Sequence, residues 1–175
     1  MEYLDLYDVN RTKTGETMAR GIKMPEGRYR LVVRVIVFNS EGKMLIQQRA
    51  SDRNSYPNMW DFSVGGSVEA GETSSQGAER ELLEELGLKF NIAGTLPSFS
   101  VNFEQGFDDF YIINYDIKAE DVVLQKEEVQ AVKWAEKEEI KEMIRTGEFI
   151  NFREPLVDLL FSFNEKRYGT FAKDE

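Results

Sequence analysis

The chain has 175 residues, of which 41% are hydrophobic and 31% are charged, and its 12 Phe, 7 Tyr and 2 Trp predict a folded core rather than disorder. Its formal net charge of -10 argues against binding to nucleic-acid polymers, which need a basic surface, and against docking on anionic lipid. The absence of cysteine and histidine excludes disulfides, cysteine nucleophiles, histidine triads and histidine zinc sites.

The first 64 residues predict short strands separated by turns. The segment 29–38 is the clearest strand, because β-branched side chains dominate it. A hairpin over about 3–21 precedes it, and glycine, asparagine and proline residues mark the turns. The expected strands cover residues 3–9, 17–21, 29–38, 44–49 and 60–64, and Gly65-Gly66 ends the last one.

The rest of the chain predicts helices together with further strands. The first helix is expected over residues 74–86, and Gly87 stands where glycine often follows a helix. Two strands within residues 89–116 are expected around a turn at 104–106, and an acidic loop follows them. The remaining elements are a strand at 129–134, helices at 136–146 and 154–166, and a frayed tail at 168–175.

This order of elements predicts an α/β (α+β) fold in which helices cover a sheet. Since no repeat or linker is visible, we expect one domain over residues 1–175, with the hairpin, a core at about 28–150 and a C-terminal helix and tail at 151–175. The N-terminus lacks a basic segment followed by an apolar stretch, and no apolar run has transmembrane length. We therefore expect a cytoplasmic protein without a membrane partner.

Three carboxylates gather on one face of the predicted helix 74–86. With roughly 100° between successive residues, Glu84 and Glu85 lie within about 60° of Glu81, and like charges at this spacing destabilise a helix. Such a cluster suits Mg²⁺ or Mn²⁺, which prefer oxygen ligands, whereas a solvated acidic surface is the alternative interpretation. The leucines of the helix lie on its other side and are expected to be buried: Leu82, Leu83 and Leu86.

Neighbouring residues favour the metal interpretation. Gly65-Gly66 lack side chains and would let the backbone approach an ion or ligand closely. Glu72 before the helix and Arg80 within it could form a bidentate pair that fixes the loop 67–73 onto the helix. An incidental surface pair, which would contribute almost nothing to stability, is the alternative.

The segment from Gly66 to Leu88 resembles the Nudix box, G-x5-E-x7-R-E-U-x-E-E-x-G-U with U aliphatic. Every specified position matches, namely Gly66, Glu72, Arg80, Glu81, Leu82, Glu84, Glu85, Gly87 and Leu88. The resemblance implies the Nudix fold, an α/β/α sandwich around a mixed central sheet, with the box as a loop–helix–loop. Segments outside the box, including 27–33, 45–49 and 57–61, resemble the Nudix subgroup related to isopentenyl-diphosphate isomerase.

The resemblance also implies a function. Nudix proteins mostly hydrolyse diphosphate linkages in nucleoside diphosphates joined to another group, so we expect a Mg²⁺-dependent (or Mn²⁺-dependent) pyrophosphatase. Glu84 and Glu85 would be the principal metal ligands, and Glu81 would be a further ligand or the base. The carbonyl of Gly66 would complete the coordination. The residues expected to shape the box are Gly66, Glu72, Arg80 and Gly87.

The box does not specify the general base. Some Nudix members use a glutamate in a later loop, and Glu128 is the candidate here because it precedes the strand leading to Trp134. The alternatives are Glu127, Glu104 and Asp108, and Glu128 could also be an ordinary loop acid.

Substrate contacts are expected from the strands beside the box. Arg49 could clamp a phosphate, or it could pair with Asp52 or Asp61 instead. Tyr56 or Trp60 could stack on a base, although core packing competes for Trp60. The further pocket residues expected, depending on strand register, are Arg34, Gln47 and Phe62.

Two other functions compete with a hydrolase. An isopentenyl-diphosphate isomerase is disfavoured, because that family uses a catalytic cysteine and histidine-rich metal ligation, and this chain has neither residue. A non-catalytic or regulatory Nudix ligand-binding protein is the remaining alternative, although such proteins commonly lose box acids. In each case we expect a small-molecule diphosphate as the partner, and a monomer or homodimer.

Overall fold

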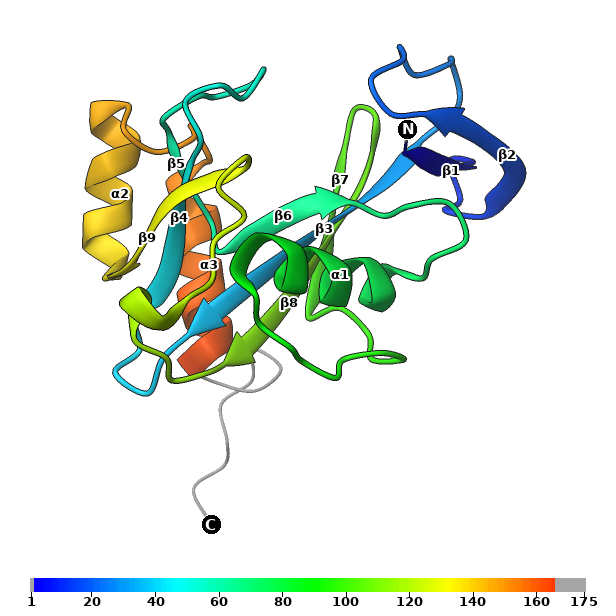
Figure 1. Ribbon diagram of the computed structural model, residues 1–175. Coiled ribbons are helices and arrows are strands. Elements are labelled where there is room, and N and C mark those ends of the chain that lie inside the picture. Colours follow the sequence, from blue (N-terminus) through cyan, green and yellow to red (C-terminus); the bar gives the residue numbers. More distant parts are fainter. Residues whose placement is uncertain (1, 166–175) are drawn as a thin grey trace.

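The computed structural model describes residues 2–165 (Figure 1). The predicted tail at 168–175 and the last residue of the predicted helix 154–166 lie outside the described residues. The strands are β1 (Tyr3–Tyr7), β2 (Lys13–Ala19), β3 (Arg30–Phe38), β4 (Met44–Arg49), β5 (Trp60–Asp61), β6 (Val64–Ser67), β7 (Phe99–Phe103), β8 (Gly106–Asn114) and β9 (Val129–Ala135). The helices are α1 (Ser74–Leu86), a short 3-10 helix η1 (Ala119–Asp121), α2 (Lys137–Thr146) and α3 (Glu154–Glu165).

A mixed sheet forms the centre of the fold, with α1 on one face and α2 and α3 on the other (Figure 1). β3 pairs in parallel with β8 and antiparallel with β6. β4 pairs antiparallel with β5 and with β9, and β7 pairs antiparallel with β8. The predicted α/β/α sandwich with a mixed sheet is therefore confirmed.

Alternation along β3 divides the apolar core between the two faces of the sheet. Val33, Val35 and Val37 are buried under α1, whereas Ile36 and Phe38 are buried under α2 and α3. This alternation explains why β3 reads as a continuous apolar run, since a central strand is covered on both faces. It also fixes which polar side chains of β3 and β8 can share a cavity.

The predicted strand at 60–64 is wrong, because the chain forms two strands there. Trp60–Asp61 pairs with β4, and Val64–Ser67 then pairs with β3. Ser63 lies between them, where its hydroxyl donates to the carbonyl of Leu45 at 2.5 Å and accepts from the amide of Val37 at 2.9 Å. These bonds satisfy backbone groups of β3 and β4 at the point where β5 ends and β6 begins. Because β6 spans Val64–Ser67, Gly65-Gly66 lie inside a strand rather than after one.

The N-terminal hairpin is present, but its second strand begins earlier than the predicted 17–21. β2 starts at Lys13, which pairs with Tyr7, and Gly15 lies in a bulge with φ +83° rather than in the turn. Backbone hydrogen bonds join Tyr7 to Tyr29, so the hairpin is attached to the start of β3.

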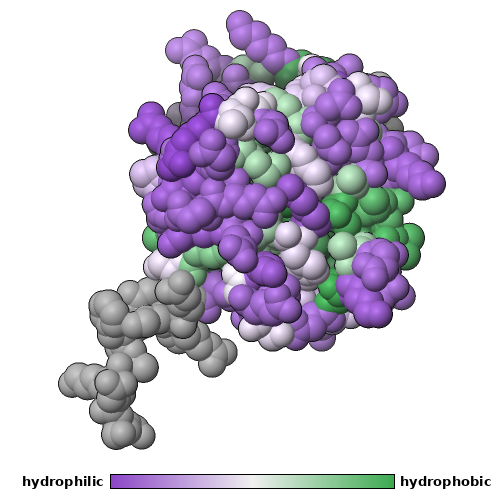
Figure 2. All heavy atoms as spheres, turned by 90° about the vertical axis from the view of Figure 1, so that its left-hand side faces the viewer, coloured by the Kyte–Doolittle hydropathy of each residue, from purple (hydrophilic) through white to green (hydrophobic). Residues whose placement is uncertain are grey.

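The face that carries α2 is mostly hydrophilic at its surface (Figure 2). Its exposed ion pairs include Arg145 with Glu154, whose atoms are 2.6 Å apart. Among residues 2–165, no helix is both long enough and apolar enough to cross a bilayer.

Candidate active site

The helix α1 has well-defined ends. Thr73 accepts a hydrogen bond from the backbone amide of Gln76, whose side chain in turn accepts from the amide of Thr73, which forms a capping box. At the other end, Gly87 adopts a left-handed conformation with φ +67°, and its amide donates to the carbonyl of Leu83 at 2.9 Å. The predicted bounds 74–86 and the terminating glycine are confirmed.

Two of the three clustered acids are buried rather than solvated. Glu81 is 6% exposed and Glu85 is 3% exposed, whereas Glu84 is exposed. A solvated acidic surface is therefore the wrong interpretation for Glu81 and Glu85. Burial of two carboxylates one helical turn apart costs free energy that packing alone does not explain.

The prediction that α1 buries all its leucines is wrong for one of them. Leu82 and Leu86 are fully buried, but Leu83 is 44% exposed. Since Glu81 and Glu85 also face the protein, the buried side of the helix includes them together with Leu82 and Leu86. At roughly 100° per residue, Leu83 points well away from the middle of that buried side.

The two glycines of β6 make room for two charged side chains. A Cβ atom on Gly66 would lie 2.0 Å from the carboxyl carbon of Glu81. A Cβ atom on Gly65 would lie 3.0 Å from Nη1 of Arg34. A side chain at position 66 would displace Glu81, so this glycine lets the carboxylate lie directly against the backbone.

Burial raises the pKa of Glu85 to about 8, and the neighbouring charge of Glu81 adds to this effect. A hydrogen bond from Nε2 of Gln47 to Oε2 of Glu85, at 3.0 Å, partly opposes it. Burial likewise raises the pKa of Glu81, although the adjacent guanidinium of Arg80 opposes that shift. The site thus favours an uncharged Glu85 unless another cation approaches it.

The side chain of Gln47 contacts Glu85 of the box and does not line the arginine-containing cavity described below. Its side chain is 2% exposed and donates to Glu85, so its predicted role as a substrate contact is wrong. Gln47 Oε1 is buried and has no hydrogen-bond partner among the described residues. An unpaired buried acceptor beside two buried acids indicates a site that lacks a positively charged or donating group.

Arg80 connects the loop before α1 to the acids of the helix. Its Nε and Nη2 atoms donate to the two carboxylate oxygens of Glu72 at 2.9 and 3.1 Å, which confirms the predicted bidentate pair. Nη2 also donates to the carbonyl of Ser67 at 2.9 Å, and Nη1 donates to Glu81 at 2.9 Å and to Glu84 at 3.1 Å. Although burial of Arg80 disfavours its charge, the bonds to Glu72 and Glu81 outweigh this and raise its pKa.

The chemistry of these groups fits a hard divalent cation. The carboxylates of Glu81 and Glu85 are buried side by side, and Glu85 has no ion pair with any other described residue. With the carbonyl of Gly66 and the exposed carboxylate of Glu84, the donors are all oxygen atoms, as Mg²⁺ and Mn²⁺ prefer. Across residues 2–165, however, no group of three or more acids is already gathered so that it could hold a metal ion. The arrangement supplies suitable ligands without a completed coordination shell.

Arginines collect in a cavity of about 430 Å³ that reaches Gly66. Arg49 and Arg34 both lie near the buried carboxylate of Asp61, at 3.8 and 3.5 Å, so the predicted pairing of Arg49 with Asp61 and its predicted place in the pocket are compatible. The arginines that line this cavity are Arg20, Arg30, Arg34, Arg49 and Arg53.

Three of these arginines were not predicted from the sequence. Arg30 could have been found, because it lies two and four residues from Val32 and Arg34 and therefore shares their face of β3. Arg20 and Arg53 come from the hairpin and from the polar loop after β4, and no periodic pattern links them to the box. Their convergence depends on tertiary structure alone.

Phe62 is a core residue, so its predicted place in the pocket is wrong. Its side chain is fully buried, and its ring centroid lies 4.5 Å from that of Phe152 and 5.5 Å from that of Phe149. Trp60 is partly buried against the α2–α3 side of the core, whereas Tyr56 is 49% exposed and lines the arginine cavity. Between these two aromatic residues, Tyr56 is therefore the one that can contact a ligand.

Glu128 lies close to the acids of α1. Its carboxylate pairs with Nη1 of Arg53 at 2.8 Å, and its charge is among the causes that raise the pKa of Glu85. Of the alternative bases, Glu104 and Glu127 are exposed, and Asp108 pairs with Arg34 instead. Among the predicted candidate bases outside the box, Glu128 is therefore the one whose charge acts on Glu85.

Comparisons with known proteins identify the family. A family model described as NUDIX domain matches residues 28–157. The chain is 46% identical over 152 residues to the Uncharacterized Nudix hydrolase lmo0368 of Listeria monocytogenes, covering 87% of this chain and 90% of that protein. The crystal structure of DR0079 from Deinococcus radiodurans is similar with a TM-score of 0.73 and 26% identity, over 91% of this chain and 97% of that chain. The MutT protein from Methanosarcina mazei Go1 shares the fold with a TM-score of 0.61 and 22% identity, over 83% and 100% of the two chains. The chain therefore belongs to the Nudix family, which confirms the predicted superfamily and supports a hydrolase that acts on phosphorus anhydrides.

Proposed function

We propose that the chain is a Mg²⁺- or Mn²⁺-dependent diphosphohydrolase that cleaves the diphosphate linkage of a nucleoside diphosphate-type substrate. The observation that carries this proposal is the pair of buried acids, Glu81 and Glu85, beside a cavity that collects arginines in an otherwise acidic protein. A substrate rich in negative charge is the ligand that requires both features, since carboxylates alone would repel it.

The box residues would hold the cation. Glu81, Glu84 and Glu85 supply carboxylates, and Gly66 supplies its carbonyl. When bound, the cation supplies positive charge to the diphosphate and makes water more acidic. Arg80 keeps Glu81 and Glu84 in place from one side through its hydrogen bonds to both carboxylates.

Glu128 is the proposed general base. Water loses a proton to its carboxylate as the water oxygen bonds to phosphorus, and the bond from phosphorus to the bridging oxygen breaks. The ion pair with Arg53 would orient Glu128 toward the cavity. Glu81 is the alternative base within the box, because burial raises its pKa as it does that of Glu85.

Arg34 and Arg49 are the proposed phosphate contacts. Both line the cavity that reaches Gly66, and both already lie near a carboxylate, Asp61, which limits their side-chain freedom. Guanidinium groups match phosphate oxygens in bidentate geometry, so two of them can bind the part of the diphosphate that the cation leaves uncovered.

Several finer assignments accompany this proposal. The resemblance to the isopentenyl-diphosphate isomerase-related subgroup concerns ancestry, since isomerase chemistry would need the cysteine and histidine that this chain lacks. A single domain over residues 1–175, a monomer or homodimer, no nucleic-acid partner and a cytoplasmic location stay predictions from the sequence. Nudix hydrolases act on small molecules, and the substrate class is set by the cavity.

The test is a hydrolysis screen with Mg²⁺ or Mn²⁺, read by chromatography of the phosphorylated products, over nucleoside diphosphates and triphosphates, nucleotide sugars, dinucleotide coenzymes and non-nucleotide diphosphates. We expect hydrolysis of one class, lost with a chelator and lost in Glu85→Gln. The exposed Glu138→Gln on α2 is the matched control and should keep full activity. If no class is hydrolysed while the protein binds Mn²⁺, the hydrolase proposal fails and a ligand-binding protein replaces it.

A further inference from the structure

A second cavity, of about 540 Å³, adjoins the arginines on the face of the sheet opposite α1. The two cavities lie next to each other, because the same residues line both, namely Arg30, Val32, Arg34, Asn151 and Phe152. Its volume lies within the range of ordinary small-molecule sites. Its apolar side chains come from β3, β7, β8 and the segment around the start of α3, and they are Val32, Val101, Phe103, Phe110, Phe152 and Leu156.

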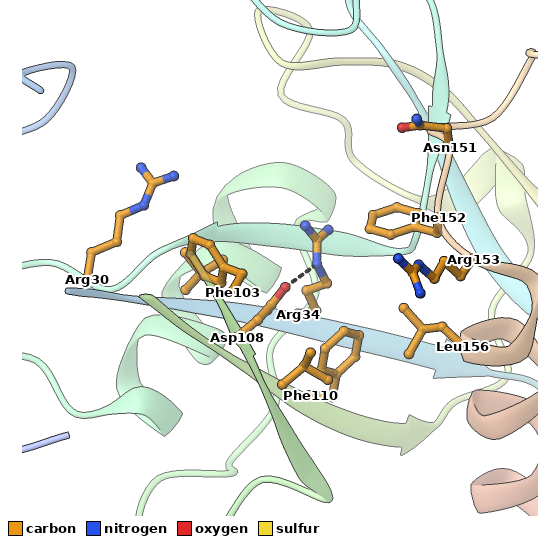
Figure 3. Close-up of a pocket in the computed structure, with 11 residues that line it drawn as sticks. Arg30, Arg34, Phe103, Asp108, Phe110, Asn151, Phe152, Arg153 and Leu156 are labelled. Carbon is orange, nitrogen blue, oxygen red and sulfur yellow. Dashed lines mark hydrogen bonds and ion pairs between the residues drawn. The ribbon is translucent and has the colours of Figure 1, made fainter. Parts of the chain in front are cut away.

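The register of the sheet places one carboxylate inside this apolar cavity. β3 and β8 run in parallel with Val32 opposite Asp108 and Arg34 opposite Phe110. Asp108 therefore shares the face of Arg34 and Phe110, whereas the adjacent Asp109 points to the α1 face. In Figure 3, Asp108 and Arg34 point toward each other at the centre, with Phe103 on one side and Phe152 on the other.

Only one oxygen of Asp108 is satisfied. Nε of Arg34 donates to Oδ2 at 2.8 Å, while Oδ1 is buried and has no hydrogen-bond partner within residues 2–165. Burial raises the pKa of Asp108, although the ion pair with Arg34 opposes that shift. In the ionised form that pairs with Arg34, the carboxylate can only accept hydrogen bonds. A buried acceptor without a donor is costly, so its presence at a cavity indicates a ligand that supplies one.

The aromatic rings are fixed next to the charged groups. The guanidinium of Arg34 lies 4.9 Å from the ring centroid of Phe152, and that of Arg30 lies 5.8 Å from the ring centroid of Phe103. The same arginines that face the first cavity thus position rings in the second. A ligand whose phosphates contact the arginines would place its attached organic group between these rings.

We propose that this cavity binds the base of the nucleotide substrate, and that Asp108 selects bases carrying an amino group. A hydrocarbon chain would leave Oδ1 of Asp108 without a donor, and a sugar would find mostly apolar side chains around its hydroxyls. A planar base with an exocyclic amino group can pack against the aromatic rings and also donate a hydrogen bond to Oδ1 of Asp108. This inference rests on the proposed function only for the identity of the ligand as a nucleotide.

The experiment measures binding without a metal, with a chelator present, so that it does not depend on turnover. The probes are cytidine and adenosine 5′-monophosphate, each paired with the analogue in which hydrogen replaces the amino group, pyrimidin-2-one riboside and purine riboside 5′-monophosphate. We expect wild-type protein to bind at least one amino-bearing nucleotide roughly 10-fold or more tightly than its partner, as loss of a hydrogen bond to a charged group predicts.

Asp108→Asn is the decisive variant. Its amide oxygen can still accept from Arg34, which places an NH₂ donor where Oδ1 was, so the preference for the amino group should disappear or reverse. Glu138→Gln, a carboxylate-to-amide change on the exposed surface of α2, should leave the preference unchanged. Should Asp108→Asn fail to fold, the paired nucleotides on wild-type protein still decide.

Equal binding of both members of each pair, or a preference that survives in Asp108→Asn, would overturn the assignment of Asp108. Binding of none of the four nucleotides would overturn the base cavity, even if the screen finds hydrolysis of a non-nucleotide diphosphate. Amino-selective binding without any hydrolysis would support the proposed base-binding cavity and contradict the proposed hydrolase function.

Discussion

Buried acids occur at two places on the α1 face of the sheet, at Asp109 and at the Glu81–Glu85 pair. The two places differ in how many hydrogen-bond donors surround each carboxylate. Asp109 is fully buried and accepts hydrogen bonds from Arg11 and from the hydroxyls of Ser74 and Ser100, each hydroxyl at 2.5 Å. Glu85 is buried almost as deeply, yet it receives one donor from Gln47 and faces another acid.

The difference separates structure from function. The acid of Asp109 joins the N-terminal hairpin, α1 and β7 to β8, so its burial is compensated where it occurs. The burial of Glu85 beside Glu81 is uncompensated, and such an arrangement persists in a stable fold when something outside the chain completes it. The number of hydrogen-bond donors around a buried acid therefore indicates whether that acid stabilises the fold or belongs to the candidate active site.

The largest expected effect is loss of turnover in Glu85→Gln. Removal of this carboxylate should lower kcat by about 100-fold or more, because a proposed cation ligand is lost. The same change should raise the Tm of the metal-free protein near neutral pH, since an amide avoids the free-energy cost of keeping a buried carboxyl group protonated there. Steady-state kinetics and a thermal melt on one preparation check both; an active variant, or one that melts earlier, contradicts the comparison.

The opposite result is expected for Asp109→Ala. The change leaves Arg11, Ser74 and Ser100 without their shared acceptor, so unfolding free energy should fall by roughly 2–4 kcal/mol. Urea denaturation measures this loss, and kcat of the folded fraction should stay within about threefold of wild type. A large fall in kcat with normal stability would place Asp109 in the catalytic site instead.

A smaller effect concerns pH. The pKa of Glu85 is raised to about 8 in the folded protein from about 4.5 in an unfolded chain, so its contribution to stability is fully present below pH 4.5 and is lost as pH rises through 8. The Tm of the metal-free wild type should therefore fall relative to Glu85→Gln between pH 5 and 8. Parallel melting curves of the two proteins across this range would refute the shift.

The box and the central strands could be predicted from the sequence because each depends on local pattern. β3 and β4 follow from β-branched and apolar residues, and α1 follows from its spacing and from Gly87. The burial of Glu81 and Glu85 could not be predicted from periodicity. Periodicity shows that the two acids share one side of the helix, but it does not show whether that side faces the sheet or water. The choice between them is made by Gly66, which leaves space for Glu81.

The substrate side was harder to predict because it depends on how strands separate. The sequence places Phe62 and Gln47 in the pocket if strand alternation is regular. At Ser63, however, the chain stops pairing with β4 and starts pairing with β3, and Phe62 next to this change lies in the core. Arg34 does line a cavity, since the regular strand β3 has no such break, and its contact with substrate stays a prediction. Asp108 was considered only as a base, because the parallel register of β8 that sets its face is absent from the sequence.

The smallest expected effect tests whether a short distance by itself marks an important charge. Nη2 of Arg145 on α2 lies 2.6 Å from Glu154, a distance similar to the 2.5 Å from the hydroxyl of Ser74 to Asp109. The side chains of Arg145 and Glu154 are 49% and 32% exposed, whereas that of Asp109 is fully buried. Water and salt screen such a pair, so Arg145→Ala should shift Tm by no more than about 2 °C and leave kcat unchanged. Thermal melts at low and high salt measure this, with Asp109→Ala beside them. A shift as large as that of Asp109→Ala would show that proximity, rather than burial and the number of partners, decides what an acid contributes to this fold.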